Sequence, residues 1–189
     1  MPAKTPAPKN LAKRPAKNPE SRRLIGLDPG LRFMGWGVVD MVGNKLVHIA
    51  NGTVASDAKL SLPERLLQLE NGLCAVFDTW QPEFAAVEQS FVNRDGAATL
   101  KLGQARAVCL LVPARRNIAV AEFAPNFIKR AVTGSGHADK KQIAAMLGIL
   151  LPQAKLGDEH CADALAVAIT LAHVGDFNKN LANALKVQA

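Results

Sequence analysis

The stretch LIGLDPG, residues 24–30, is a short apolar run that stops abruptly, and it decides how the rest of the chain is interpreted. The apolar run predicts a buried strand, and the Asp-Pro-Gly that follows is a turn signal. Asp28 therefore lies at the carboxyl end of a buried strand, which is where open α/β sheets form their sites. An acid before Pro-Gly is also typical of a plain turn, so Asp28 alone leaves both interpretations open.

Strand and helix patterns continue outward from this stretch. Two further strands are predicted at 35–40 and 45–54, with Gly43-Asn44 as the hairpin turn between them. The later elements, in chain order, are a helix at 61–80, a strand at 84–88, a helix at about 97–116 that Pro113 kinks or ends early, a strand at 119–123, helices at 125–132 and 140–150, and a final helix at about 159–174. A three-strand meander followed by alternating helices and strands predicts an α/β fold with a mixed five-stranded sheet flanked by helices.

The 189 residues predict one folded domain at 23–175, between a disordered basic arm at 1–22 and a C-terminal tail at 176–189. The arm is rich in proline, alanine and lysine, and most of the net charge of +7 lies in the first 23 residues. Such a segment cannot bury enough apolar surface to order itself. It is interpreted either as a non-specific contact to nucleic acid or as a solubilising extension.

Composition excludes several classes of protein. No apolar run approaches the roughly 18 residues that a membrane-spanning helix needs, which excludes a membrane protein. Cys74, Cys109 and Cys161 form no CxxC pair, which argues against a disulfide framework or a cysteine-rich zinc site. We therefore expect reduced thiols and a cytoplasmic protein.

Acidic residues recur where the predicted elements begin or end. Glu88 ends the strand at 84–88, and the final helix begins with DEHCAD at 158–163. His160 and Asp163 are three residues apart and so share one face of that helix. The small apolar run that follows is suited to close packing on the sheet, which would bring this face over the strand ends. Glu88 as a surface acid and His160 as a packed or capping residue remain the alternatives.

Three carboxylates and an imidazole in one cleft would repel one another or shift their pKa values. A divalent cation relieves this repulsion, and oxygen ligands with one imidazole suit Mg²⁺ or Mn²⁺. Two such ions about 4 Å apart can activate a water molecule and stabilise the leaving oxygen of a phosphodiester. The residues alone therefore favour metal-dependent phosphodiester hydrolysis.

Five motifs, in this order, carry a resemblance to a known family. They are GLDPG at 26–30, GWGV at 35–38, EQSF at 88–91, LKLGQAR at 100–106 and ADALA at 162–166. Together they resemble the RuvC family of bacterial Holliday-junction resolvases, over about residues 23–175. The resemblance implies a ribonuclease H-like fold and a homodimer that cuts four-way DNA junctions in recombination and repair by paired symmetric nicks, with two Mg²⁺ or Mn²⁺ ions in each active site and a branch-migration motor complex as a partner.

The resemblance also implies roles for individual residues. It assigns the metal-binding catalytic role to Asp28, Glu88, His160 and Asp163. It makes Phe91 an aromatic wedge between bases, and it places Lys129 and Lys140 on the DNA. His160 stands where the family usually has an aspartate, which puts the metal preference in question.

The charge pattern agrees with DNA binding. Basic residues far outnumber acids between residues 94 and 141, and phosphate contact is their natural use. Lys101 and Arg106 join Lys129 and Lys140 as predicted DNA contacts, although several charges in this region are equally typical of solvated helix faces.

Two rival functions differ in class. An actin-like ATPase also begins with a strand that ends in Asp-x-Gly, but that architecture needs two such lobes. A non-catalytic junction-binding module would keep the basic surface and lose the acids, and all the acids are present.

Overall fold

The computed structural model describes residues 18, 20–89 and 95–174. Phe91, the predicted tail at 176–189 and nearly all of the predicted arm lie outside the described residues. Within them the first strand begins at Arg22, which is the last residue assigned to the arm.

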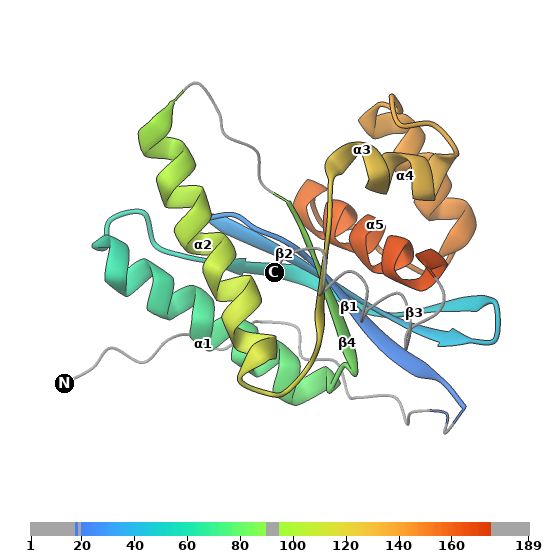
Figure 1. Cartoon of the computed structure of the whole chain (residues 1–189), viewed down its shortest axis with the longest axis horizontal. Coiled ribbons are helices and arrows are strands. Elements are labelled where there is room, and N and C mark those ends of the chain that lie inside the picture. The colour runs from blue at the N-terminus through green and yellow to red at the C-terminus, as the bar shows by residue number, and fades with distance from the viewer. Residues whose placement is uncertain (1–17, 19, 90–94, 175–189) are drawn as a thin grey trace.

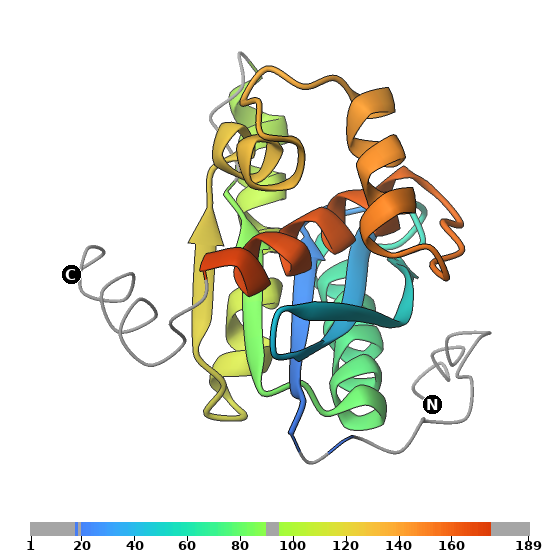
Figure 2. The ribbon, with the colours of Figure 1, turned by 90° about the vertical axis from the view of Figure 1, so that its right-hand side faces the viewer.

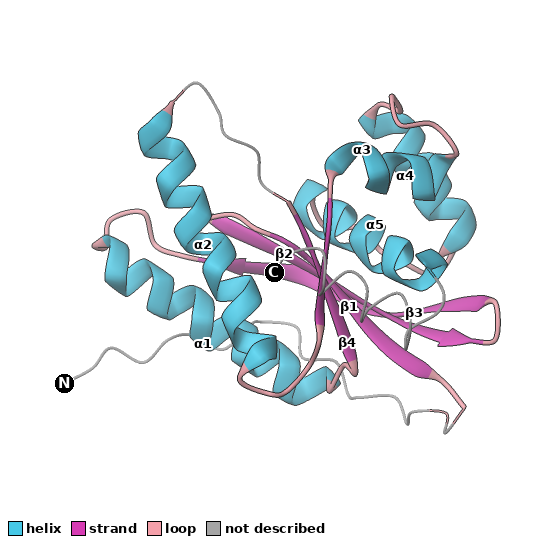
Figure 3. Cartoon of the chain, in the orientation of Figure 1, coloured by secondary structure: helices cyan, strands magenta, loops and turns pink. Residues whose placement is uncertain are grey.

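A single mixed sheet forms the centre of the molecule (Figure 3). Its strands are β1 (Arg22–Asp28), β2 (Phe33–Val42), β3 (Lys45–Ala55), β4 (Phe84–Glu88) and β5 (Val120–Phe123), in the order β3-β2-β1-β4-β5. The meander β1-β2-β3 is antiparallel, whereas β4 and β5 run parallel to β1. The carboxyl ends of β1, β4 and β5 therefore meet at one edge of the sheet. The predicted mixed five-stranded sheet is confirmed.

Helices cover both faces of the sheet (Figures 1 and 2). The helices α1 (Leu62–Trp80) and α2 (Gly96–Ala114) lie on one face, and α3 (Pro125–Thr133), α4 (Lys140–Leu150) and α5 (Glu159–Val174) lie on the other. Two apolar cores fill the layers, one under α1 and α2 and the other under α3, α4 and α5. The helix α2 ends one residue after Pro113, as its missing N–H and bulky ring predict.

Helix α5 lies unusually close to the sheet, because β1 and β2 present glycines beneath it. A β-carbon on Gly26 would stand 2.1 Å from the carbonyl oxygen of Ala164, and one on Gly35 would stand 2.1 Å from that of His160. No side chain fits in either gap. The first turn of α5 is thus held over the carboxyl ends of β1 and β4, as the small apolar run predicts.

None of the helices in the described part of the chain is both long and apolar enough to cross a membrane.

Candidate active site

The centre of the candidate site is a contact between β1 and α5. The Nδ1 atom of His160 lies 3.0 Å from Oδ2 of Asp28, and both side chains are partly buried. The helix start that carries His160 is capped by Asp158, whose Oδ1 accepts a hydrogen bond from the Cys161 N–H at 2.9 Å. Thr53 of β3 donates to the other oxygen of Asp158 at 2.6 Å. Asp158 thereby caps the helix start and ties it to the edge of the sheet.

Glu88 and Asp163 meet around a small cavity beside this contact. The cavity measures about 170 Å³, and its polar lining comes from Glu88, Asp163, Lys129 and Lys140. Glu88 arrives from the end of β4, and Asp163 lies one turn after His160 on α5. The structure therefore brings the four predicted metal-binding residues to one edge of the sheet.

The carboxyl groups share one electrostatic environment. Burial raises the pKa of Asp28 to about 6, with a smaller increase from Asp163, while the hydrogen bond to His160 lowers it. Burial raises the pKa of Glu88 to about 7, and the charges of Asp28 and Asp163 add to the increase. The pKa of Asp163 is also raised, mainly by burial. Neighbouring carboxylates thus destabilise one another's ionised forms, as the sequence predicts.

The donor set fits a hard divalent cation. Three carboxyl groups supply oxygen and His160 supplies one nitrogen, which suits Mg²⁺ or Mn²⁺. As the side chains lie, no group of three or more His, Cys, Asp or Glu in the described part of the chain is close enough to hold a metal ion. Metal binding would therefore require Glu88 and Asp163 to move closer to the Asp28–His160 pair, and a bound cation would lower the raised pKa values of the three carboxyl groups.

Two of the predicted DNA contacts lie at this centre. Lys129 lines the cavity, and its charge lowers the pKa of Glu88. Lys140 donates to Glu159 at 2.5 Å, and this hydrogen bond raises the pKa of Lys140. Both ammonium groups thus stand beside the acids, and Lys140 has an exposed partner from the first turn of α5.

The other predicted DNA contacts are placed differently. Arg106 forms an ion pair with Glu122 of β5, and the Glu122 side chain is largely buried. Lys101 is exposed on α2. Phe91 lies outside the described residues, so its role as a wedge remains a prediction.

Comparison with known proteins identifies the family to which the chain belongs. The family model for crossover junction endodeoxyribonuclease RuvC matches residues 24–171. The chain belongs to the RuvC family. A RuvC of Parvibaculum lavamentivorans is 58% identical over 167 residues, which cover 88% of this chain and 95% of that protein. A RuvC of Mesorhizobium japonicum is 57% identical over 151 residues, which cover 80% of this chain and 89% of that one.

Solved structures agree with the assignment to the RuvC family. RuvC of Thermus thermophilus in complex with a Holliday junction substrate superposes with a TM-score of 0.77 at 29% identity, covering 83% of this chain and 96% of that chain. The yeast mitochondrial Holliday junction resolvase, at 13% identity and a TM-score of 0.59, shares the fold. The predicted ribonuclease H-like fold is confirmed, and the match of nearly the whole RuvC length removes the actin-like ATPase from consideration.

Sequence reasoning missed two contributors to this RuvC-family site. Phe33, the first residue of β2, packs its ring against the imidazole of His160. The available signal was the arginine–aromatic pair Arg32-Phe33, four and five residues after the strand-end Asp28. Thr53 gave no signal, because its contact with Asp158 joins residues that are 105 positions apart.

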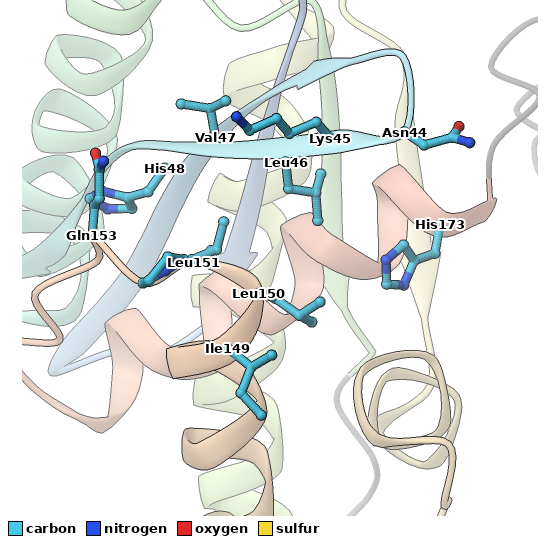
Figure 4. A pocket seen from close by; sticks show the side chains of 11 residues that line it. Asn44, Lys45, Leu46, Val47, His48, Ile149, Leu150, Leu151, Gln153 and His173 are labelled. Atoms are coloured by element: carbon cyan, nitrogen blue, oxygen red, sulfur yellow. The ribbon is translucent and has the colours of Figure 1, made fainter.

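A larger cavity, of about 520 Å³, lies elsewhere on the molecule (Figure 4). It is bounded by the start of β3, the end of α4 and His173 near the end of α5. The Nδ1 atom of His173 lies 3.1 Å from the carbonyl oxygen of Ala131. The described residues that line this cavity include no carboxylate, so the smaller cavity between Glu88 and Asp163 is the better candidate for the chemistry.

Proposed function

We propose that Asp28, Glu88, His160 and Asp163 form the metal-dependent centre with which this crossover junction endodeoxyribonuclease resolves four-way DNA junctions. The observation that carries the proposal is the convergence of Glu88 and Asp163 with two lysines on one cavity, beside the Asp28–His160 contact. Acids that raise one another's pKa are suited to a cation, and lysines at the same place are suited to phosphate.

Mg²⁺ or Mn²⁺, two ions in each site, is the proposed cofactor. Bound at these residues, such ions would supply activation of a water molecule for in-line attack and stabilisation of the leaving oxygen. The three carboxylates hold the cations, and they must be ionised to do so. His160 contributes a nitrogen ligand whose orientation is restrained by its hydrogen bond to Asp28.

Lys129 and Lys140 have a separate role, which is to hold the scissile strand. Both lysines line the same cavity as Glu88 and Asp163, so their ammonium groups are proposed to contact the phosphates on either side of the cut. Lys101 and Arg106 are proposed as further DNA contacts on α2, although Arg106 is paired with Glu122 in this structure. Phe91, only three residues after Glu88, is proposed to unstack bases near the junction centre.

A homodimer is the proposed working unit. Its two-fold symmetry matches that of a folded four-way junction and so gives paired symmetric nicks. Each nick leaves a 5′-phosphate and a 3′-hydroxyl, which a ligase can seal. Recognition then rests mainly on the shape of the junction. The proposed setting is the cytoplasm, in recombination and repair, with a branch-migration motor complex as a partner.

The test is cleavage of a synthetic four-way junction and of a linear duplex with the same sequence, each with Mg²⁺ and with Mn²⁺. We expect paired nicks in the junction, an intact duplex, and ligatable products. Binding of the junction without cleavage by either metal would instead support the non-catalytic binding module.

A further inference from the structure

Phe33 contacts the candidate active site without belonging to its donor set. Its ring centroid lies 5.7 Å from that of the His160 imidazole, with the two planes tilted by 35°. Phe33 is 36% exposed and belongs to neither apolar core of the described residues. An aromatic ring in this position adds little to the packing of the domain, and its described aromatic contact joins it to the site.

The guanidinium group of Arg32 also contacts the Phe33 ring. The guanidinium carbon of Arg32 lies 5.1 Å from the centroid of the Phe33 ring, within the range of a cation–π contact. The contacts therefore form a continuous series in which Arg32 meets Phe33, Phe33 meets His160, and His160 meets Asp28.

The backbone of His160 is also fixed, which leaves only its ring free to turn. A β-carbon on Gly35 would stand 3.1 Å from the Cβ of His160, so β2 lies directly beneath this residue. The imidazole can then change its orientation by rotating about its side-chain bonds. Asp28 restrains one ring nitrogen, and Phe33 restrains the plane of the ring.

We infer that Phe33 is a positioning residue, which holds the His160 imidazole in the orientation needed for metal binding, and that Arg32 steadies the Phe33 ring. The inference rests on the proposed role of His160. Hydrogen-bonding partners that orient a metal-ligating histidine usually change metal affinity by about 10–100-fold when they are removed, and we expect a ring that restrains the same imidazole to act at the lower end of this range. Without the ring, the imidazole of His160 samples other orientations, and the centre binds its cation less tightly.

The experiment is a calorimetric titration of the DNA-free protein with Mn²⁺, for wild type and for Phe33→Leu, Phe33→Tyr and His160→Ala. Leucine keeps the apolar bulk and removes the ring, whereas tyrosine keeps the ring. We expect Phe33→Leu to bind Mn²⁺ about tenfold more weakly. Phe33→Tyr should bind like wild type, and His160→Ala at least as weakly as Phe33→Leu.

Three further measurements separate positioning from other roles. The ¹⁵N spectrum of the His160 ring should show one tautomer in wild type and exchange between states in Phe33→Leu. The kcat of Phe33→Leu for junction cleavage should fall, while its junction affinity measured without metal stays at the wild-type value.

The matched control is Phe84→Leu. Phe84 also makes a cation–π contact, since Arg22 lies over its ring at 5.8 Å, but this contact is at the opposite end of β1 from the site. This control should leave Mn²⁺ affinity unchanged.

Each contrary outcome has a distinct meaning. Weaker junction binding by Phe33→Leu with unchanged Mn²⁺ affinity would make Phe33 a DNA contact and overturn the inference. If His160→Ala binds Mn²⁺ weakly and Phe33→Leu binds it like wild type, the proposed function stands and the positioning role of Phe33 is overturned. Wild-type Mn²⁺ affinity in His160→Ala would overturn the metal role of His160 itself, and the inference with it.

Discussion

Strand β1 carries a charged residue near each of its ends, Arg23 at the amino end and Asp28 at the carboxyl end. The Arg23 side chain is fully buried and satisfied, with Nε and Nη2 donating to the two oxygens of Asp40 at 2.7 and 2.8 Å. Its Nη1 donates to the carbonyl oxygen of Trp80 at 3.1 Å. At the other end, Asp28 is largely buried among acids, and its pKa is raised to about 6.

The comparison shows how one strand can serve stability and function separately. At the amino end, each buried charge has a partner of opposite sign, so removing one partner damages the fold. At the carboxyl end, carboxylates crowd together without enough positive charge, so we expect the removal of one of them to stabilise the fold and to reduce the activity. Functional sites commonly carry this kind of local cost.

The largest expected effect is on catalysis. Asp28→Asn should abolish junction cleavage, because asparagine keeps the size of the side chain and loses the charge that holds the cations. Junction binding should remain, since Asp28 lies among the acids of the centre. The measurement is single-turnover cleavage beside a binding titration, and a cleavage rate above about a tenth of wild type would remove Asp28 from the catalytic set.

The next effect is on stability, at the opposite end of β1. Arg23→Met should lower the free energy of unfolding by about 3–5 kcal/mol, because it leaves Asp40 buried without a partner. The double variant Arg23→Met with Asp40→Leu should recover part of the loss, since it removes both charges. Denaturant unfolding measures both free energies. A double variant no more stable than Arg23→Met would show that the loss does not come from leaving Asp40 buried without a partner.

The pH dependence of cleavage should follow the raised carboxyl pKa values. Asp28 and Glu88 have raised pKa values of about 6 and about 7, so both take up protons as the pH falls through this range. A protonated carboxyl group binds a cation poorly, so cleavage should decline from pH 8 toward pH 6. Raising the Mn²⁺ concentration should move the midpoint to lower pH. A cleavage rate that stays constant over this range would contradict the assigned roles.

A smaller effect concerns the choice of metal. An imidazole is a softer ligand than a carboxylate, and Mg²⁺ prefers oxygen ligands more strictly than Mn²⁺ does. Wild type should therefore cut at least as fast with Mn²⁺ as with Mg²⁺, and His160→Asp should shift the ratio toward Mg²⁺. Equal ratios of the two rates in both proteins would show that His160 does not set the preference.

The fold, and the placement of the four candidate site residues at one edge of the sheet, were predictable from the sequence because their signals are local. Strands that end in Asp28 and Glu88, and a helix face that carries His160 and Asp163, can each be recognised within a few residues. The small residues that follow on α5 predict its close approach to the sheet, and Gly26 completes that contact.

Contacts between distant segments were not predictable in the same way. The Arg23–Asp40 pair depends on the antiparallel register of β1 and β2, in which these two residues are direct partners. The pairing of Arg106 with Glu122 depends on how α2 lies against β5. From the sequence, Arg106 was therefore interpreted as a basic residue that could contact DNA, and its acidic partner was not recognised. The contact between Phe33 and His160 likewise appears only when β2 and α5 are stacked.

The most direct test of the contrast between the two ends of β1 is the thermal unfolding of metal-free wild type and Asp28→Asn. Because burial raises the pKa of Asp28, the folded state holds its proton more tightly than the unfolded chain, so ionisation lowers stability as the pH rises through about 4 to 6. At pH 8, Asp28→Asn should therefore be more stable than wild type by about 1–3 kcal/mol. The gain should shrink near pH 4, and Mn²⁺ should raise the melting temperature of wild type more than that of Asp28→Asn. A metal-free Asp28→Asn that melts below wild type at pH 8, with an undiminished response to Mn²⁺, would contradict the account.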